Sequence, residues 1–176
     1  MYYSLIRKFD IANGEGIRVS LFVSGCKFYC EDCFNSEAWD FNHGKPFTHK
    51  TFEEIIELVK DPNVSGLSIL GGDPLWQDTS ALFELQALCC SVHKANKTVW
   101  IWSGFTWEEI FPVVVPTYPM KNFSLKRTLI ANCDIWVDGR FDKNLKDLQL
   151  KWRGSSNQRV IDIQRSLKEG CAVLYE

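Results

Sequence analysis

The sequence has 176 residues, which fits one domain, since soluble domains usually hold roughly 100 to 200 residues. Hydrophobic residues make up 45% and charged residues 24%, and this composition excludes intrinsic disorder. Lys and Arg total 20 against 22 Asp and Glu, so the net charge of −2 provides no overall attraction for nucleic-acid phosphates or an anionic membrane surface. We therefore expect a globular protein without a nucleic-acid partner.

Membrane and export signals are also missing from the pattern. The apolar runs are far shorter than the ~20 residues that a membrane-spanning helix needs, and residues 1–18 carry charges where a secretory signal has an apolar core. We expect a cytoplasmic protein that is not membrane-embedded. Seven cysteines, three of them within residues 26–33, favour metal or redox chemistry over a disulfide framework.

Periodic patterns predict strands alternating with helices. Residues 18–23 form an apolar run that ends at Ser24 and Gly25, which predicts a strand and a turn. Helix-capping boxes at residues 51–54 and 106–109 predict two helix starts, the first helix running to about residue 60. Apolar residues at helical spacing predict a third helix at residues 79–94. Short apolar runs predict further strands at residues 67–70, 98–102, 135–137 and 160–163.

The spacing of the strands predicts the fold class. Those that begin at Leu67, Thr98 and Ile135 are separated by the roughly 30 or more residues of a βαβ unit, which indicates a parallel sheet in an α/β fold. A closed eight-unit barrel needs about 250 residues, so we expect a partial (β/α) barrel of about four to six mostly parallel strands. The polar loops at the carboxyl ends of these strands are expected to converge on one site, within a single domain spanning residues 1–176.

The clearest chemical motif is a cysteine loop just after the strand at residues 18–23. Cys26, Cys30 and Cys33 have the spacing C-x3-C-x2-C. Four-iron clusters usually take four cysteines, so three leave one iron open to an external ligand. A zinc site completed by His43 or His49 is the alternative, although structural zinc loops favour paired ligands and no second pair exists here. The remaining cysteines are expected to be inert buried thiols: Cys89, Cys90, Cys133 and Cys171.

A second motif follows the strand at residues 67–70. Gly71 and Gly72 would let the backbone approach a ligand closely, and Asp73 could accept from an amino group. By itself a Gly-Gly-Asp-Pro sequence is most often only a turn. Because this loop and the cysteine loop sit at the carboxyl ends of neighbouring strands, the two together predict a centre that binds an amino acid group beside an open iron.

These motifs resemble those of the radical S-adenosylmethionine enzymes, and more narrowly the family of enzymes that activate anaerobic ribonucleotide reductases. The resemblance covers about residues 1–160. The cysteine spacing marks only the superfamily, whereas residues 137–141 and 152–158 are much more specific to the activating enzymes. The segments that carry it are Trp39 and residues 13–18, 24–26, 33–35, 46–48, 71–75, 100–104, 137–141 and 152–158.

The resemblance implies two cofactors and residues to hold them. A [4Fe-4S] cluster would be ligated by Cys26, Cys30 and Cys33, and S-adenosylmethionine would chelate the open iron through its amino and carboxylate groups. The amino group would be received by Gly71, Gly72 and Asp73, with Ser103 at the carboxylate or the ribose.

The adenosyl moiety is expected beside residues 32–34. Many enzymes of the superfamily have an aromatic residue just before the third cysteine to pack on the adenine, but Asp32 stands there in this chain, followed by Cys33. The ring of Phe34 or of Tyr29 could take over that packing, or either ring could belong to the core.

The reaction implied by the resemblance is the activation of a partner. An external one-electron donor such as flavodoxin or ferredoxin would reduce the cluster, and cleavage of S-adenosylmethionine would give a 5′-deoxyadenosyl radical. That radical would remove hydrogen from a glycine of the large subunit of anaerobic ribonucleotide reductase. A polar segment at about residues 143–176 is expected to contact this partner, although residues 152–158 could instead be a solvated turn.

Two other functions fit the same motifs. The first is a radical S-adenosylmethionine enzyme that acts on a small metabolite or on another glycyl-radical enzyme. The second is a module without enzyme activity that is stabilised by zinc or carries electrons.

Asp138 could order a ribose hydroxyl or cap a turn, and the sequence favours the turn.

Overall fold

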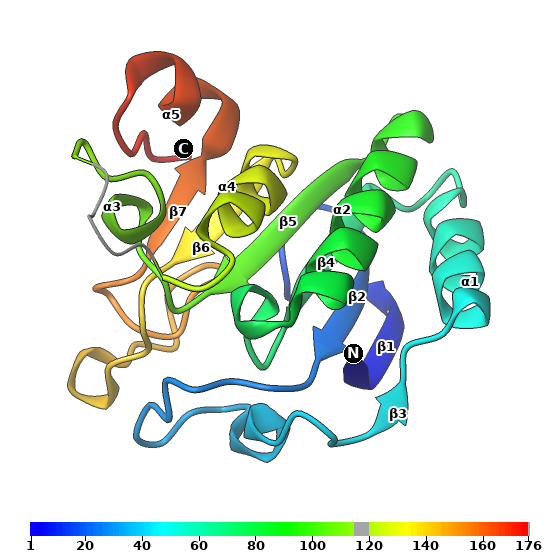
Figure 1. Cartoon of the computed structure of the whole chain (residues 1–176), viewed down its shortest axis with the longest axis horizontal. Coiled ribbons are helices and arrows are strands. Elements are labelled where there is room, and N and C mark those ends of the chain that lie inside the picture. The colour runs from blue at the N-terminus through cyan, green and yellow to red at the C-terminus, as the bar shows by residue number, and fades with distance from the viewer. Residues whose placement is uncertain (115–119, 176) are drawn as a thin grey trace.

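The computed structural model describes residues 1–114 and 120–175, and its centre is one sheet of seven strands (Figure 1). The strands are β1 (Tyr2–Asp10), β2 (Arg18–Val23), β3 (Lys45–Pro46), β4 (Gly66–Gly71), β5 (Thr98–Ser103), β6 (Ile135–Asp138) and β7 (Arg159–Asp162). The α-helices are α1 (His49–Val59), α2 (Thr79–Lys94), α3 (Trp107–Ile110), α4 (Phe123–Ala131) and α5 (Ile163–Glu169).

The four central strands confirm the predicted parallel arrangement. The order across the sheet is β3-β1-β2-β4-β5-β6-β7, and the pairings β2–β4, β4–β5 and β5–β6 are parallel. The outer pairings, β1–β2, β1–β3 and β6–β7, are antiparallel. Strands β2, β4, β5 and β6 therefore all end at the same edge of the sheet, as expected for βαβ connections.

The expected number of four to six strands is wrong, because the sheet has seven. Strand β1 escapes sequence reasoning because its residues are mostly half-buried or exposed and include Arg7, Lys8 and Asp10. Strand β3 has only two residues and is too short for a periodic pattern. Both add antiparallel pairings beyond β2, so the α/β class is confirmed while the sheet is only partly parallel.

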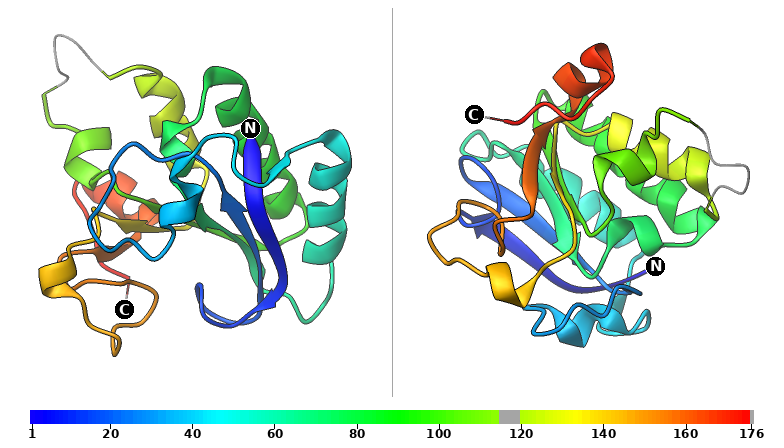
Figure 2. Two further views of the ribbon diagram at one scale, coloured as in Figure 1. Left: turned by 90° about the horizontal axis from the view of Figure 1, so that it is seen from below. Right: turned by 90° about the vertical axis from the view of Figure 1, so that its left-hand side faces the viewer.

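The main helices cover one face of the sheet. Figure 2 shows α1, α2 and α4 on the same side of the strands, and α2 contacts both of its neighbours. The main core lies between these helices and the sheet, where residues such as Leu67, Ile101 and Leu85 are fully buried. No helix in residues 1–114 and 120–175 has the length and apolar character needed to cross a membrane.

The helix starts show how well local capping chemistry was predicted. Helix α2 spans the predicted residues, and Asp78 caps it by accepting from the Ala81 N–H. Helix α1 begins earlier than the predicted box at residues 51–54, because Thr48 is the N-cap and accepts from the Thr51 N–H. The predicted box at Thr106 does cap a helix, α3, which is one turn long. Helices α4 and α5 were not predicted.

A buried arginine holds the amino-terminal ends of the central strands together. Arg18, at the start of β2, is 1% exposed and its guanidinium donates to the Ser68 hydroxyl at 2.7 Å and the Leu67 carbonyl at 2.8 Å. It also donates to both the hydroxyl and the carbonyl of Thr98, at 3.0 and 3.1 Å, and lies over the ring of Trp100. Burial lowers the pKa of Arg18 to about 10. One side chain thus crosslinks β2, β4 and β5.

We expect Arg18→Met to lower the free energy of unfolding by about 3 kcal/mol, because the carbonyls of Leu67 and Thr98 lose a charged donor and stay buried. Chemical denaturation would measure the change. Arg165→Met is the matched control, since Arg165 is exposed on α5 and should shift stability by less than about 0.5 kcal/mol. Equal stability of the two variants would show that Arg18 does not crosslink the strands.

Candidate functional site

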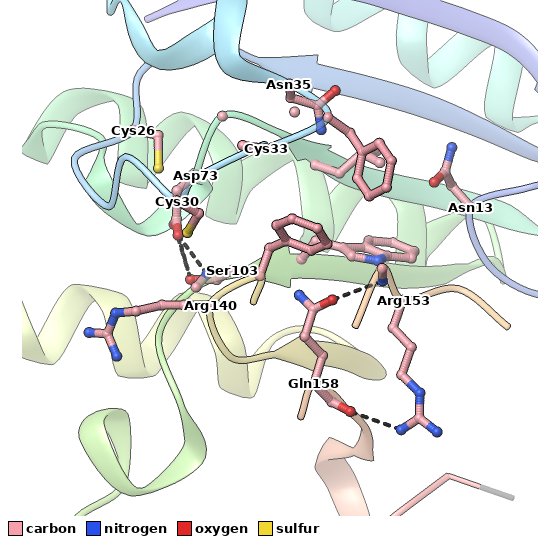
Figure 3. A pocket seen from close by; sticks show the side chains of 18 of the residues that line it. Asn13, Cys26, Cys30, Cys33, Asn35, Asp73, Ser103, Arg140, Arg153 and Gln158 are labelled. Carbon is pink, nitrogen blue, oxygen red and sulfur yellow. Dashed lines mark hydrogen bonds between the residues drawn. The ribbon is translucent and has the colours of Figure 1, made fainter. Parts of the chain in front are cut away.

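The loops that follow the four parallel strands line one cavity of about 430 Å³ (Figure 3). They come from the chain after β2, β4, β5 and β6, so the prediction that these loops converge is confirmed. The cavity wall is completed by residues 147–154 and by the loop after β1. The residues of the four loops that line it are Cys26, Phe28, Cys30, Cys33, Phe34, Asn35, Trp39, Gly71, Gly72, Asp73, Ser103, Gly104, Gly139, Arg140 and Phe141.

The cysteine loop leaves β2 and lines the cavity. Its path is held by backbone bonds in which Gly25 donates to the Ala38 carbonyl at 2.7 Å and Cys26 to the Trp39 carbonyl at 3.1 Å. Gly25 has φ +105°, and a Cβ there would lie 2.3 Å from the ring of Phe41, so the turn requires glycine.

All three cysteines of the motif are free thiols that line the cavity. Cys26 is 8% exposed, and Cys30 and Cys33 are half-buried. Burial, followed by the negative charge of Asp73, raises the pKa of the Cys26 thiol to about 12. The pKa of Cys30 is also raised, mainly by burial, although the positive charge of Arg140 opposes that rise. These thiols would therefore need a metal to displace their protons before they could act as ligands.

The arrangement fits an iron–sulfur cluster better than a single metal ion. Within residues 1–114 and 120–175, no three cysteine, histidine or acidic side chains surround one point closely enough for a single ion. His43 and His49 do not line the cavity, so neither is placed to complete a zinc site. A four-iron cluster holds its ligands further apart than one ion does, and three thiols around one cavity suit that larger group.

The second motif brings backbone close to the cysteine loop. Gly71 has φ +103°, and a Cβ at Gly72 would lie 2.7 Å from the Gly25 carbonyl oxygen. The Gly72 N–H donates to the Val23 carbonyl at 2.7 Å and the Asp73 N–H to the Gly25 carbonyl at 2.9 Å. Neither glycine could be replaced without moving one loop away from the other.

The Asp73 carboxylate connects the loop after β4 to the loop after β5. It is 1% exposed and accepts from the Leu75 N–H at 2.8 Å, the Gly104 N–H at 2.8 Å and the Ser103 hydroxyl at 2.9 Å. Burial raises the pKa of Asp73 to about 6, although the hydrogen bonds from these three donors oppose that rise. Ser103 therefore points its hydroxyl hydrogen at Asp73 (Figure 3). This carboxylate sets the shape of the cavity floor and puts negative charge beneath it.

The rings considered for adenine packing differ in position. Phe34 lines the cavity, packs edge-on against Phe141 with ring centroids 5.2 Å apart, and is 59% exposed. Tyr29 and Asp32 are exposed and lie outside the cavity lining, and Tyr29 packs against Trp39 instead. Phe34 is therefore the better placed of the two aromatic candidates.

The loop at residues 152–158 is bonded both within itself and to the loop after β6. Gln158 accepts from the N–H groups of Gly154 and Ser155 and donates to the Gly139 carbonyl, and Asn157 donates to the Arg140 carbonyl. These two amides are thus occupied within the protein. Arg153 uses one guanidinium donor on the Gln158 carbonyl at 2.8 Å and lines the cavity (Figure 3).

Among the described residues, Asp138 accepts from the start of α3 and from Arg159 and not from the turn that follows it, so the expectation of a turn cap is not met. Its side chain is 1% exposed, accepts from the Trp107 N–H at 2.8 Å and pairs with Arg159, and it lies outside the cavity lining.

Among the other cysteines, Cys89 and Cys133 are fully buried, but Cys90 and Cys171 are exposed, so the expectation of burial is wrong for those two. Both lie on helical or terminal surface that faces away from the core.

Arg140 is the main cavity residue to which sequence reasoning assigned no role. Its guanidinium carbon lies 4.5 Å from the ring centroid of Phe28, and it pairs with Glu109 at 2.8 Å. The signal was present, because Arg140 belongs to the segment 137–141 that carried the family resemblance. Trp102, Trp152 and Asn13 also line the cavity.

Comparisons with known proteins agree with this site. Residues 12–161 match the family model described as a 4Fe-4S single cluster domain. The anaerobic ribonucleoside-triphosphate reductase-activating protein of Pasteurella multocida is 36% identical over 153 residues, covering 86% of this chain and 90% of that protein. The proteins of the same name from Escherichia coli K12 and Enterobacteria phage T4 are 35% and 32% identical, and each match covers 91% of this chain and 97% and 93% of theirs. The chain therefore belongs to the family of anaerobic ribonucleoside-triphosphate reductase-activating proteins.

Proposed function

We propose that this protein activates an anaerobic ribonucleotide reductase by reductive cleavage of S-adenosylmethionine at a [4Fe-4S] cluster. The observation that carries the proposal is the meeting of three free cysteines and the Gly71–Asp73 loop in one cavity. When bound, the cluster would supply the electron that splits the sulfonium, and the resulting 5′-deoxyadenosyl radical would take hydrogen from a glycine of the reductase large subunit. The family match and the names of the relatives support this activity.

The residues of the cavity have separate tasks in this proposal. Cys26, Cys30 and Cys33 would ligate the cluster at the wall of the cavity that they line. Gly71 and Gly72 bring backbone to the methionyl amino group. The buried negative charge of Asp73 favours binding of the N–H donors of that amino group. These two loops are bonded to each other, so cluster and cofactor would keep a fixed relative position.

Other residues of the cavity could contact the carboxylate, the ribose and the adenine of S-adenosylmethionine. Ser103, at the end of β5, would contact the carboxylate or the ribose, and the exposed ring of Phe34 would pack on the adenine beside Cys33. Asp32 precedes Cys33 in the same loop but is exposed and does not line the cavity, so its contact with the cofactor would be peripheral. Exclusion of water from this pocket would keep the radical from side reactions.

We propose that the cavity at the carboxyl ends of the parallel strands admits a polypeptide of the reductase. In this proposal the sheet acts as the partial barrel of the radical S-adenosylmethionine enzymes. Residues 147–154 form one wall of the cavity and carry Arg153, while β7 and α5 of the expected partner segment are built into the sheet and its flank. This narrows partner contact to the part of residues 143–176 nearest the cavity.

An electron must enter from outside, since the chain offers no second redox group in its motifs. We propose an external one-electron donor such as flavodoxin or ferredoxin, and a cytoplasmic location. The cysteines in the described residues are all free, which agrees with a reducing compartment.

Cys30→Ala should abolish cluster assembly, because two thiolates cannot hold a four-iron cluster that already leaves one iron open. The measurement is iron content with the visible absorption spectrum after anaerobic reconstitution, where the parent protein should hold about four irons per chain. Cys90→Ala is the control, since that thiol is exposed on α2 and outside the cavity. Full iron content in Cys30→Ala would rule out the proposed ligands.

Asp73→Asn should weaken binding of S-adenosylmethionine by about ten- to a hundredfold, because a buried charge-assisted contact is worth about 1.5 to 3 kcal/mol. Calorimetry on the cluster-loaded protein would measure the affinity. Asp138→Asn is a close control: Asp138 is equally buried and accepts from a helix start after the neighbouring strand, but lies outside the cavity. The proposal for Asp73 fails if both variants bind the cofactor as the parent does.

Arg153→Ala should reduce the yield of glycyl radical on the reductase while leaving dithionite-driven cleavage of S-adenosylmethionine intact. Loss of a charged partner at an interface commonly costs about 2 to 5 kcal/mol. Electron paramagnetic resonance would measure the radical, and chromatography would measure 5′-deoxyadenosine. Lys151→Ala, which removes a nearby exposed charge outside the cavity lining, is the control. A parallel loss of cleavage and radical in Arg153→Ala would place Arg153 in the cofactor site or the fold.

A further inference from the structure

Three aromatic rings pack together behind the cysteine loop. Phe28, which lies between Cys26 and Cys30, has its ring centroid 5.5 Å from that of Trp76 and 4.9 Å from that of Phe105. The rings of Trp76 and Phe105 are 5.2 Å apart. This aromatic trio therefore joins the cysteine loop to the chain after β4 and after β5.

Cations lie over all three rings of the trio. The Lys27 ammonium is 5.6 Å from the Trp76 centroid, and the Arg140 guanidinium carbon is 4.5 Å from the Phe28 centroid. Lys27 is exposed, and Arg140 pairs with Glu109 at the surface. Solvent and the carboxylate therefore weaken the field of both of these charges inside the cavity.

Lys126 differs because its charge is buried. It lies on α4, is 3% exposed, and places its ammonium 4.7 Å from the Trp76 centroid and 4.4 Å from the Phe105 centroid. Its hydrogen-bonding contact in residues 1–114 and 120–175 is the Met120 sulfur at 3.6 Å. Burial lowers the pKa of Lys126, and the negative charge of Asp73 opposes that change.

Within residues 1–114 and 120–175, the Lys126 ammonium has no oxygen partner. Such a buried charge is costly to a fold, and rings alone return only part of that cost, so the charge points to a role at the neighbouring site. Phe28 of the aromatic trio lies between Cys26 and Cys30, and Lys126 lies over the other two rings, so the ammonium and the cysteine loop contact the same apolar cluster. A cluster held by three thiolates in this region would be negatively charged, and each added electron would increase that charge.

We propose that Lys126 is an electrostatic positioning residue whose buried positive charge favours the reduced state of the cluster and so raises its reduction potential. The inference rests on the proposed function, because it requires a cluster on the cysteine loop. The electron comes from the external one-electron donor, and the cluster gains one negative charge without bond formation or proton transfer. Among the cations at the trio, only Lys126 combines burial with a position away from a surface carboxylate.

The test is a redox titration of the anaerobically reconstituted protein, with mediator dyes and electron paramagnetic resonance of the reduced cluster. Lys126→Met keeps the length and apolar stem of the side chain and removes its charge. At the midpoint potential of the parent protein, the ratio of reduced to oxidised cluster should fall about three- to tenfold, as expected for one charge at an effective dielectric constant of about 20. A tenfold fall corresponds to about 59 mV for a one-electron couple.

Controls separate the charge from the packing. Lys126→Arg keeps the charge and should restore the potential, and Lys94→Met removes an exposed charge at the end of α2 and should not change it. Lys126→Met should also unfold at the same temperature as the parent protein or higher, because it removes a buried charge. A merely structural lysine would instead lower the melting temperature and leave the potential unchanged.

The outcomes also distinguish the two proposals. If the parent protein assembles no cluster, the proposed function fails. If the cluster forms in Lys126→Met with an unchanged potential, only the inference about Lys126 fails. Should Lys126→Met not assemble a cluster, Lys126→Gln provides a second neutral side chain, and its potential decides in the same way.

Discussion

The candidate site depends on one buried carboxylate. Asp73 accepts hydrogen bonds from the chain after β4 and from the chain after β5, so it joins two loops that are about 30 residues apart in the sequence. Its backbone N–H in turn donates to Gly25, which adds the cysteine loop. Three loops therefore have fixed relative positions before any cofactor binds. Such preorganisation is what a site needs if it is to direct a reactive radical at one atom.

The opposite ends of the strands are held by a buried charge of the other sign. Arg18 binds carbonyls and hydroxyls of β4 and β5 near the ends where these strands begin, whereas Asp73 acts where they end. In the part of the chain that the structure describes, neither residue has an ion-pair partner that could replace its hydrogen bonds. Strands β2, β4 and β5 are thus held at both of their ends, and the ends near Asp73 are the ones that carry the cavity. This explains why a sheet with polar outer strands can support a precise site.

Charge around the cavity is distributed unevenly. The whole chain has a net charge of −2, yet cations surround the aromatic trio of Phe28, Trp76 and Phe105 behind the cysteine loop. Asp73 supplies negative charge near these cations, and the cysteines would add to it as thiolates once they held a cluster. An environment of this kind can control how easily an iron–sulfur centre accepts an electron, because potentials respond to net charge and solvent exposure. Lys126 is the buried member of the group, and it acts through the residues that shape the cavity.

The sequence by itself determined the order of the central strands along the chain, the cysteine loop, the glycine turn and the family, because these depend on short patterns read within a few residues. It missed β1, β3, α4 and α5, whose residues lack a clear apolar period. Only the tertiary structure decided that Asp73 accepts from Ser103 and Gly104, that residues 152–158 bond to the loop after β6, and that Lys126 lies over the rings of Trp76 and Phe105. Burial and hydrogen-bond partners across many residues arise from packing, and no local pattern encodes them.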